Sequence, residues 1–300
     1  METGADMVSE RFVGAIGIAG GSVFLAVLPF GRVTALRSVA LGLALVVALW
    51  LWLARGPRSV PLLPAFGVWL AAALLSLVAT HNMAASLDAI YSEVVRSFAV
   101  FFVFYVLTAR LPAYRAWVAA SALGFGLLST LAVVSFFQHG AWVFYYAPLL
   151  GEFATLAVTV LPLLAGYLAF ARDDRRLALL CGVGLVAALI AGYLTYSRAF
   201  WLALTCGLVV AVAIHSARAA QLGRRAVLVV ALVCSVGAAL AAVVAAERGL
   251  ELTAMDTRWP IYSAVLNKLP HNPLTGTGYG HETDKHWYER ALPGTSVFHP

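Results

Sequence analysis

Charged residues are scarce in this chain, and their scarcity excludes an ordinary soluble domain. Asp, Glu, Lys and Arg make up 11% of the 300 residues, while hydrophobic residues make up 62%. Soluble globular domains carry about 25% charged and roughly 45–50% apolar residues. The apolar excess is not one buried core, because it recurs as runs of about 17–23 residues, each long enough to cross a hydrocarbon layer.

Cysteines are also few, and their positions argue against a metal site. The chain has three, Cys181, Cys206 and Cys234, and each lies inside an apolar run without a second cysteine at metal-ligand spacing. Packing among apolar neighbours explains such cysteines better than metal binding does.

Clusters of positive charge are missing too, although the net charge is +6. The arginines occur in pairs between apolar runs, as charges that flank membrane spans do. A nucleic-acid-binding face would gather them on one surface. We therefore expect no nucleic-acid partner, and expect membrane lipids around the chain.

The apolar runs themselves predict an all-α fold, a polytopic transmembrane helical bundle of about nine spans within residues 1–246. The N-terminal segment carries acidic residues and no clear cleavage site, so we expect the first span to be retained. Residues 81–92 are too polar to span and are expected to lie at the membrane interface. The predicted spans are residues 12–30, 38–54, 62–79, 95–109, 116–137, 149–170, 177–195, 199–216 and 226–246.

The distribution of Lys and Arg predicts which side of the membrane each connection faces. With the N-terminus inside, eleven of these residues fall in inside loops and four in outside loops, before the end of the ninth span. This positive-inside bias places the turn at residues 195–198 and the tail 247–300 outside. The tail is polar and has no spanning run. Because the span count is odd and this loop has no closing element, we expect further spans after Pro300.

Two arginines in the outside segments are candidates for a functional role. Arg198 lies in a very short turn between two apolar runs, near the membrane–water boundary, where a charge usually has a partner or a task. The alternative is an arginine that reaches toward water and is anchored beside Trp201. Arg258 begins a short amphipathic segment of the tail, and its alternative is an ordinary loop charge.

Histidines and acidic residues restrict the possible chemistry further. Four of the seven histidines lie in the last thirty residues, without the paired spacing of a zinc site, although one could act as a general base. Acidic residues are nearly absent from the predicted spans, with Glu152 as the main exception. Ion-coupled transporters usually carry such residues in mid-membrane, so their scarcity argues against a transporter.

Three segments together resemble the O-antigen ligase and polymerase superfamily. They are residues 196–204 (YSRAFWLAL), 258–262 (RWPIY) and 271–280 (HNPLTGTGYG), and they occur in the order and on the predicted side typical of that superfamily. The specific motifs cover about residues 177–300, whereas the earlier spans match only in number and hydrophobicity. The resemblance implies a GT-C-like membrane glycosyltransferase of about twelve spans, with residues 247–300 beginning a large periplasmic loop that carries the active-site segment.

The resemblance also implies an activity and the residues that perform it. Such enzymes move a glycan from undecaprenyl diphosphate to an acceptor at the periplasmic face of the bacterial inner membrane. The acceptor is lipid A–core in O-antigen ligases, a glycan in polymerases, and a protein hydroxyl in protein O-glycosyltransferases. The superfamily's two arginines map onto Arg198 and Arg258, as diphosphate-binding residues. Its catalytic histidine belongs to a His-Asn pair after the glycine-rich segment, which we expect beyond Pro300, so His299 is only a substitute candidate for the general base.

The chemistry of a lipid-linked donor makes a metal unnecessary. Arginines bind phosphate oxygens with charge-assisted, often bidentate hydrogen bonds and can stabilise a departing diphosphate. We therefore expect no metal and no cofactor, with His299 as the candidate general base in an inverting displacement. The alternatives are a flippase or transporter for a lipid-linked oligosaccharide, and a membrane scaffold in which both arginines are structural.

Overall fold

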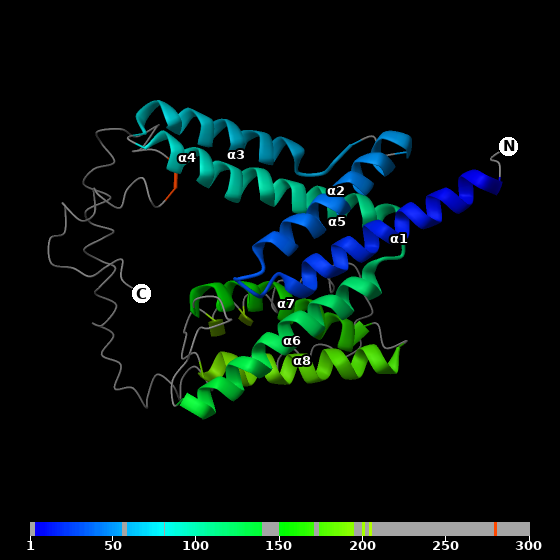
Figure 1. Ribbon diagram of the computed structural model, residues 1–300. Helices are drawn as coiled ribbons and strands as arrows, with labels where there is room; N and C mark the ends of the chain where they lie inside the picture. The colour runs from blue at the N-terminus through cyan, green and yellow to red at the C-terminus, as the bar shows by residue number, and fades with distance from the viewer. Residues whose placement is uncertain are drawn as a thin grey trace, which may run out of the picture. The chain divides into compact units, whose positions relative to one another are not determined.

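The computed structural model describes residues 4–55, 59–80, 82–139, 150–170, 174–194, 200–201, 204–205 and 279–280. Every element assigned within these ranges is a helix (Figure 1). The all-α prediction is therefore confirmed for this part of the chain. The two predicted spans at residues 199–216 and 226–246 lie largely outside it.

Helices occupy the positions of the first seven predicted spans. Within the described residues, four helical stretches are long and apolar enough to cross a membrane: Thr34–Ala54, Met83–Arg110, Tyr114–His139 and Arg175–Leu194. Three shorter apolar helices, Phe12–Val27, Leu63–Ala79 and Thr155–Leu168, accompany them. The protein is thus a helical membrane protein, and the number of its spans stays a prediction.

The helices of the described residues are α1 (Gly4–Val27), α2 (Thr34–Arg55), α3 (Leu63–Ser76), α4 (Met83–Ala89), α5 (Arg96–Arg110), α6 (Tyr114–His139), α7 (Leu150–Phe170) and α8 (Arg175–Leu194), with a 3-10 turn η1 (Leu77–Ala79) and a π-helical segment η2 (Ile90–Val95).

Residues 82–92, which were expected to lie at the membrane interface, begin a helix, and their position at the interface stays a prediction. Asn82 caps a helix here by accepting a hydrogen bond from the backbone N–H of Ala85 at 3.1 Å. The helix then continues through α4 and η2 into α5, as one apolar stretch of 28 residues. At 1.5 Å per residue it extends about 42 Å, beyond a ~30 Å hydrocarbon layer, so its first turns have room to lie in the interface.

The described helices belong to two compact units, with boundaries inside α2 and α5. One unit comprises Met1–Leu51 and Leu107–Arg248, and the other comprises Trp52–Val106 and Gly249–Pro300. We describe each by itself and name them the α6 unit and the α3 unit.

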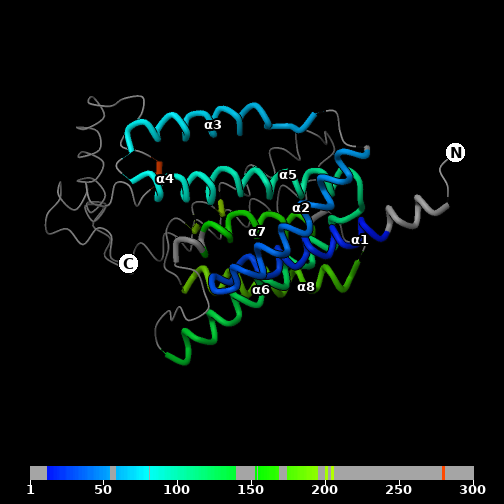
Figure 2. The backbone as a smooth tube through the Cα atoms, turned by 45° about the horizontal axis from the view of Figure 1, so that its top comes forward, coloured from blue at the N-terminus to red at the C-terminus, as the bar shows by residue number. Residues whose placement is uncertain are grey.

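Small residues let the helices of the α6 unit approach closely. Helix α6 packs against α1 and α8, and α7 packs against α8 (Figures 1 and 2). Gly124 of α6 lies against the carbonyl of Ala26 in α1, where a side chain would collide with backbone. A Cβ on Gly184 of α8 would lie 3.2 Å from the carbonyl oxygen of Ala122. Such small-residue contacts are a usual way for membrane helices to associate, since lipid supplies little hydrophobic driving force between them.

The α3 unit pairs α3 with the long helix formed by α4, η2 and α5. Helix α3 contacts η2, and a small core of Ala73, Ile90 and Val94 lies between them. Farther along, Phe66 of α3 packs edge-on against Phe98 of α5, with ring centroids 5.1 Å apart. The aromatic contacts continue along α5 to Tyr105, which stacks on Phe101 at 5.9 Å. The hairpin of α3 and this long helix contacts Tyr279 and Gly280 of the third motif.

Candidate functional site

The three residues predicted to perform the chemistry lie outside the described part of the chain. Arg198, Arg258 and His299 all fall in ranges that the structure does not describe. Their proposed roles therefore stay predictions. Residues of the same motifs are described, however: Phe200, Trp201 and Leu204 of the first motif, and Tyr279 and Gly280 of the third.

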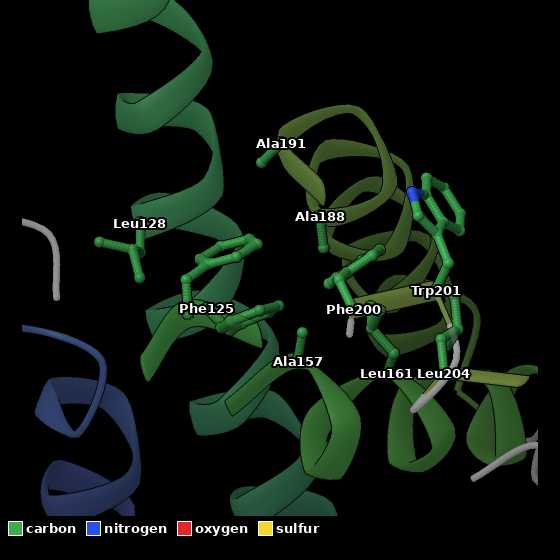
Figure 3. Packing of buried hydrophobic residues seen from close by; sticks show 10 residues of the cluster. Phe125, Leu128, Ala157, Leu161, Ala188, Ala191, Phe200, Trp201 and Leu204 are labelled. Carbon is green, nitrogen blue, oxygen red and sulfur yellow. The ribbon is translucent and has the colours of Figure 1, made fainter. Parts of the chain in front are cut away.

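Phe200 and Trp201 anchor the motif that contains Arg198. Both are buried in a cluster built by α6, α7 and α8, which Figure 3 shows from close by. The ring of Phe153 stacks on Phe125 at 5.2 Å and on Phe200 at 6.1 Å. Trp201 then meets Phe200 edge-on at 5.0 Å. Aromatic pairs at these separations contribute about 0.5–1.5 kcal/mol each beyond the burial of their area.

A glycine of α8 makes room for this anchor. The ring of Phe200 lies directly against Gly192, where even a methyl group would overlap it. Gly192 and Phe200 are both buried, and Phe200 is fully so. The motif therefore packs into the α6 unit through a specific cavity-filling contact and not only through its hydrophobicity.

Trp201 belongs to the buried part of the motif that contains Arg198. An arginine that only reaches toward water was expected to be anchored beside a tryptophan at the membrane–water boundary. Trp201 is instead 4% exposed and packs inside the cluster of Phe200 and Leu204. It is a core residue of the α6 unit, and both explanations of Arg198 stay predictions.

Tyr279 anchors the glycine-rich motif to the α3 unit. The indole Nε1–H of Trp69 donates a hydrogen bond to the Tyr279 hydroxyl oxygen, with 3.1 Å between the heavy atoms. The ring packs beside the small core of Ala73, Ile90 and Val94. The hydroxyl also forms a hydrogen bond with the side chain of Glu93, in η2. Figures 1 and 2 show this short segment of the tail, in red, beside α4.

Burial and the carboxylate of Glu93 raise the pKa of Tyr279 above the ordinary value of 10.0 for a tyrosine. Burial is the larger cause, and the hydrogen bond and negative charge of Glu93 act in the same direction. The hydrogen bond from Trp69 opposes them because it favours the phenolate. The phenol therefore stays protonated at neutral pH and can donate to Glu93.

Gly280 completes the contact because only glycine fits there. Its φ is +98°, a conformation that L side chains rarely adopt. A Cβ at this position would lie 2.5 Å from the Cβ of Ala89 in α4. Gly276, Gly278 and Gly280 alternate in this motif. The last of them is required for a close approach to α4.

Sequence reasoning missed Trp69, Glu93 and Ala89, which hold the glycine-rich motif. Trp69 and Tyr279 lie 210 positions apart, so no local pattern connects them. Glu93 could have been noticed, because it is a carboxylate at the edge of an apolar run. In the structure it lies in the segment Ile90–Val95, within the candidate span Met83–Arg110.

Within the described ranges, no group of three or more His, Cys, Asp or Glu side chains could hold a metal ion. This describes only part of the chain, and a metal-independent reaction stays a prediction. The clustered histidines of the tail lie outside these ranges.

The apolar helices define the protein as a helical membrane protein, and sequence comparison gives one family match. Residues 183–300 match the model of a family described as O-antigen ligase. The match bears out the resemblance found in the three motifs, because all three lie within the matched residues. Neither the comparison with curated proteins nor the comparison with solved structures gives a match.

Proposed function

We propose that this protein transfers a glycan from undecaprenyl diphosphate to lipid A–core, as an O-antigen ligase of the bacterial inner membrane with its active site facing the periplasm. The observation that carries the proposal is the match of residues 183–300 to the O-antigen ligase family. That range contains Arg198, Arg258 and His299, together with both anchored motifs. The proposed architecture is GT-C-like, with residues 1–246 as the membrane bundle and 247–300 as the start of the periplasmic loop.

The proposed reaction is a single inverting displacement at the sugar carbon that carries the diphosphate. An acceptor hydroxyl oxygen forms the new bond to this carbon while the bond to the phosphate oxygen breaks. Arg198 and Arg258 bind the departing undecaprenyl diphosphate and stabilise its developing negative charge. His299 accepts the proton of the acceptor hydroxyl. No metal takes part.

The two anchors support this arrangement by limiting where the motifs can move. Arg198 precedes the buried Phe200 by two positions, so chain geometry keeps their Cα atoms within about 7 Å of each other. Arg258 precedes Tyr279 in the same tail, and Tyr279 is held by Trp69 and Glu93. Substrate-binding groups fixed by packing stabilise a transition state better than groups on unrestrained segments.

The family match leaves three acceptors open, and a product assay separates them. The full-length protein in nanodiscs is supplied with an undecaprenyl-diphosphate-linked glycan and lipid A–core, and the products are resolved by mass. A covalent glycan–lipid A–core product supports the ligase. A lengthened glycan on undecaprenyl diphosphate indicates a polymerase, and a glycosylated protein indicates a protein O-glycosyltransferase. Movement of the intact donor across the bilayer without any covalent product would support a flippase and contradict the proposal.

A further inference from the structure

The hydrogen bonds around Tyr279 join two parts of the sequence that are far apart. One hydroxyl contacts Trp69 on α3 and Glu93 on η2, so it connects both helices of the hairpin to the glycine-rich tail. Gly280 adds a close backbone approach to α4 at Ala89. Three elements of the α3 unit thus hold two consecutive residues of the tail.

Packing alone does not require the hydroxyl group of Tyr279 or its two hydrogen-bond partners. Tyr279 is partly buried and borders the apolar core of Ala73, Ile90 and Val94. A phenylalanine would fill that space equally well. The hydroxyl instead accepts from an indole and bonds to a carboxylate, which fixes both the depth and the orientation of the ring. Hydrogen bonds to charged groups contribute more than neutral ones, so Glu93 is the stronger partner.

The local backbone of Glu93 is also unusual. It lies in the π-helical segment Ile90–Val95, between α4 and α5. Such segments are rare, are commonly short interruptions of α-helices, and occur frequently at functional sites. Here the interruption places Glu93 toward Tyr279 while Ile90 and Val94 stay buried against α3.

We propose that Trp69, Tyr279 and Glu93 form a latch that holds the tail on the α3 hairpin, and that Glu93 is a positioning residue for glycan transfer. This inference rests on the proposed function, because the positioned tail carries Arg258. The latch sets the location of the tail segment without touching the donor. Loss of the latch lowers the fraction of molecules whose tail is in the reactive position. The observed transfer rate is proportional to this fraction and therefore falls with it.

Four variants separate the latch from a general structural effect. Tyr279→Phe removes only the hydroxyl, and Glu93→Ala removes the acceptor. Glu93→Gln keeps an acceptor oxygen and should restore the latch in large part. Asp88→Ala is the matched control, because Asp88 is an exposed carboxylate on the same long helix, in α4.

The first measurement is hydrogen–deuterium exchange of the tail peptide that contains Tyr279, in the full-length protein in nanodiscs. Exchange there should increase about tenfold or more in Tyr279→Phe and Glu93→Ala, the change expected when one hydrogen bond to a charged acceptor is lost. Exchange in Glu93→Gln should lie between that of the wild type and that of Glu93→Ala, because the neutral amide is a weaker acceptor, and Asp88→Ala should exchange as the wild type does. Unchanged exchange in Glu93→Ala would overturn the latch, whatever the protein catalyses.

The second measurement is glycan transfer from an undecaprenyl-diphosphate-linked donor by the same preparations. Tyr279→Phe and Glu93→Ala should each lower the transfer rate about tenfold, and the double variant should be little worse because both changes break one interaction. Additive losses, or normal transfer despite faster tail exchange, would contradict the positioning role. Absence of transfer by the wild type would contradict the proposed function instead, and the exchange experiment would still decide whether the latch exists.

Discussion

Phe200 and Gly192 fit together so closely that the aromatic ring occupies the space of the missing side chain. The ring comes from the motif that contains Arg198, and the glycine belongs to the last turn of α8. The pair therefore joins the motif to the helix that precedes it in the sequence. The stacked rings of Phe153 and Phe125 continue the contact into α7 and α6.

Replacing Phe200 with alanine should destabilise the protein by about 3–5 kcal/mol, because the change opens a cavity in a fully buried cluster. The measurement is thermal unfolding in detergent, together with the amount of folded protein in the membrane. Phe137→Ala is the matched control, since Phe137 of α6 is 75% exposed. Equal stability of the two variants would mean that the Phe200 contact does not hold the motif in place.

Replacing Gly280 with alanine should release the tail from α4. The positive φ alone costs an L residue roughly 1–2 kcal/mol, and the new methyl group would also collide with Ala89. Hydrogen exchange of the tail should increase, while exchange in α3 stays near the wild-type value. Gly67→Ala in α3 is the control, because its Cβ meets nothing within 4 Å. If Gly280→Ala leaves tail exchange unchanged, the close approach to α4 is incorrect.

Replacing Arg198 or Arg258 with lysine should lower glycan transfer by about 100-fold or more while membrane abundance stays normal. Lysine keeps the charge but lacks the planar guanidinium that binds two phosphate oxygens at once. The double variant should be little worse than either single one, because both residues act on one leaving group. Arg175→Lys is the matched control, since Arg175 is exposed at the start of α8. Wild-type rates in both single variants would make the two arginines structural.

The phenol of Tyr279 should titrate above the value of about 10 for a free tyrosine. Because its pKa is raised in the docked tail, the latch is at full strength below the undocked pKa and weakens as pH rises through the raised value. The measurement is the phenolate absorbance of the wild type minus that of Tyr279→Phe. Glu93→Ala should lower the midpoint, since Glu93 contributes to the upward shift. A midpoint at or below 10 would contradict the burial of this ring.

Chelation by EDTA should leave glycan transfer unchanged. Two arginines on the diphosphate supply the charge that a divalent cation provides in metal-assisted transfer. The assay compares initial rates of the full-length protein before and after chelation and dialysis. Loss of activity that magnesium or manganese restores would favour a metal-assisted mechanism.

The helices were predictable from the sequence because each apolar run is long enough to span a membrane and is bounded by charge or by helix-breaking residues. The extension of the fourth predicted helix back to Met83 was not predictable from polarity, since the polar residues within 81–92 indicated a segment at the membrane interface. Their helix forms because Asn82 caps it and because the residues that follow favour helix. The helical preference of these residues, together with the cap, therefore decided the local structure, and the polarity of single side chains did not.

The candidate site was predictable only as motifs. The segment around Phe200 was recognised by its residue pattern, but its contact with Gly192 depends on how α8 and α7 pack. The partners of Tyr279 could not be predicted at all, because Trp69 and Glu93 belong to helices near the other end of the chain. Long-range hydrogen bonds leave no periodic signal in a single sequence.

The π-helical segment at Ile90–Val95 makes the long helix sensitive to the number of its residues rather than to their identity. Successive residues of an α-helix are rotated by about 100°, so one additional residue in a turn turns everything beyond it by that angle. Ile90 and Val94 lie within the interruption, and the aromatic residues Phe98 and Phe101 lie after it. Both sets contact α3. Deleting a single residue from the segment would convert it to regular α-helix and rotate one set away from α3 while the other stayed. An in-frame one-residue deletion here would therefore disrupt the hairpin more severely than most substitutions at the same positions.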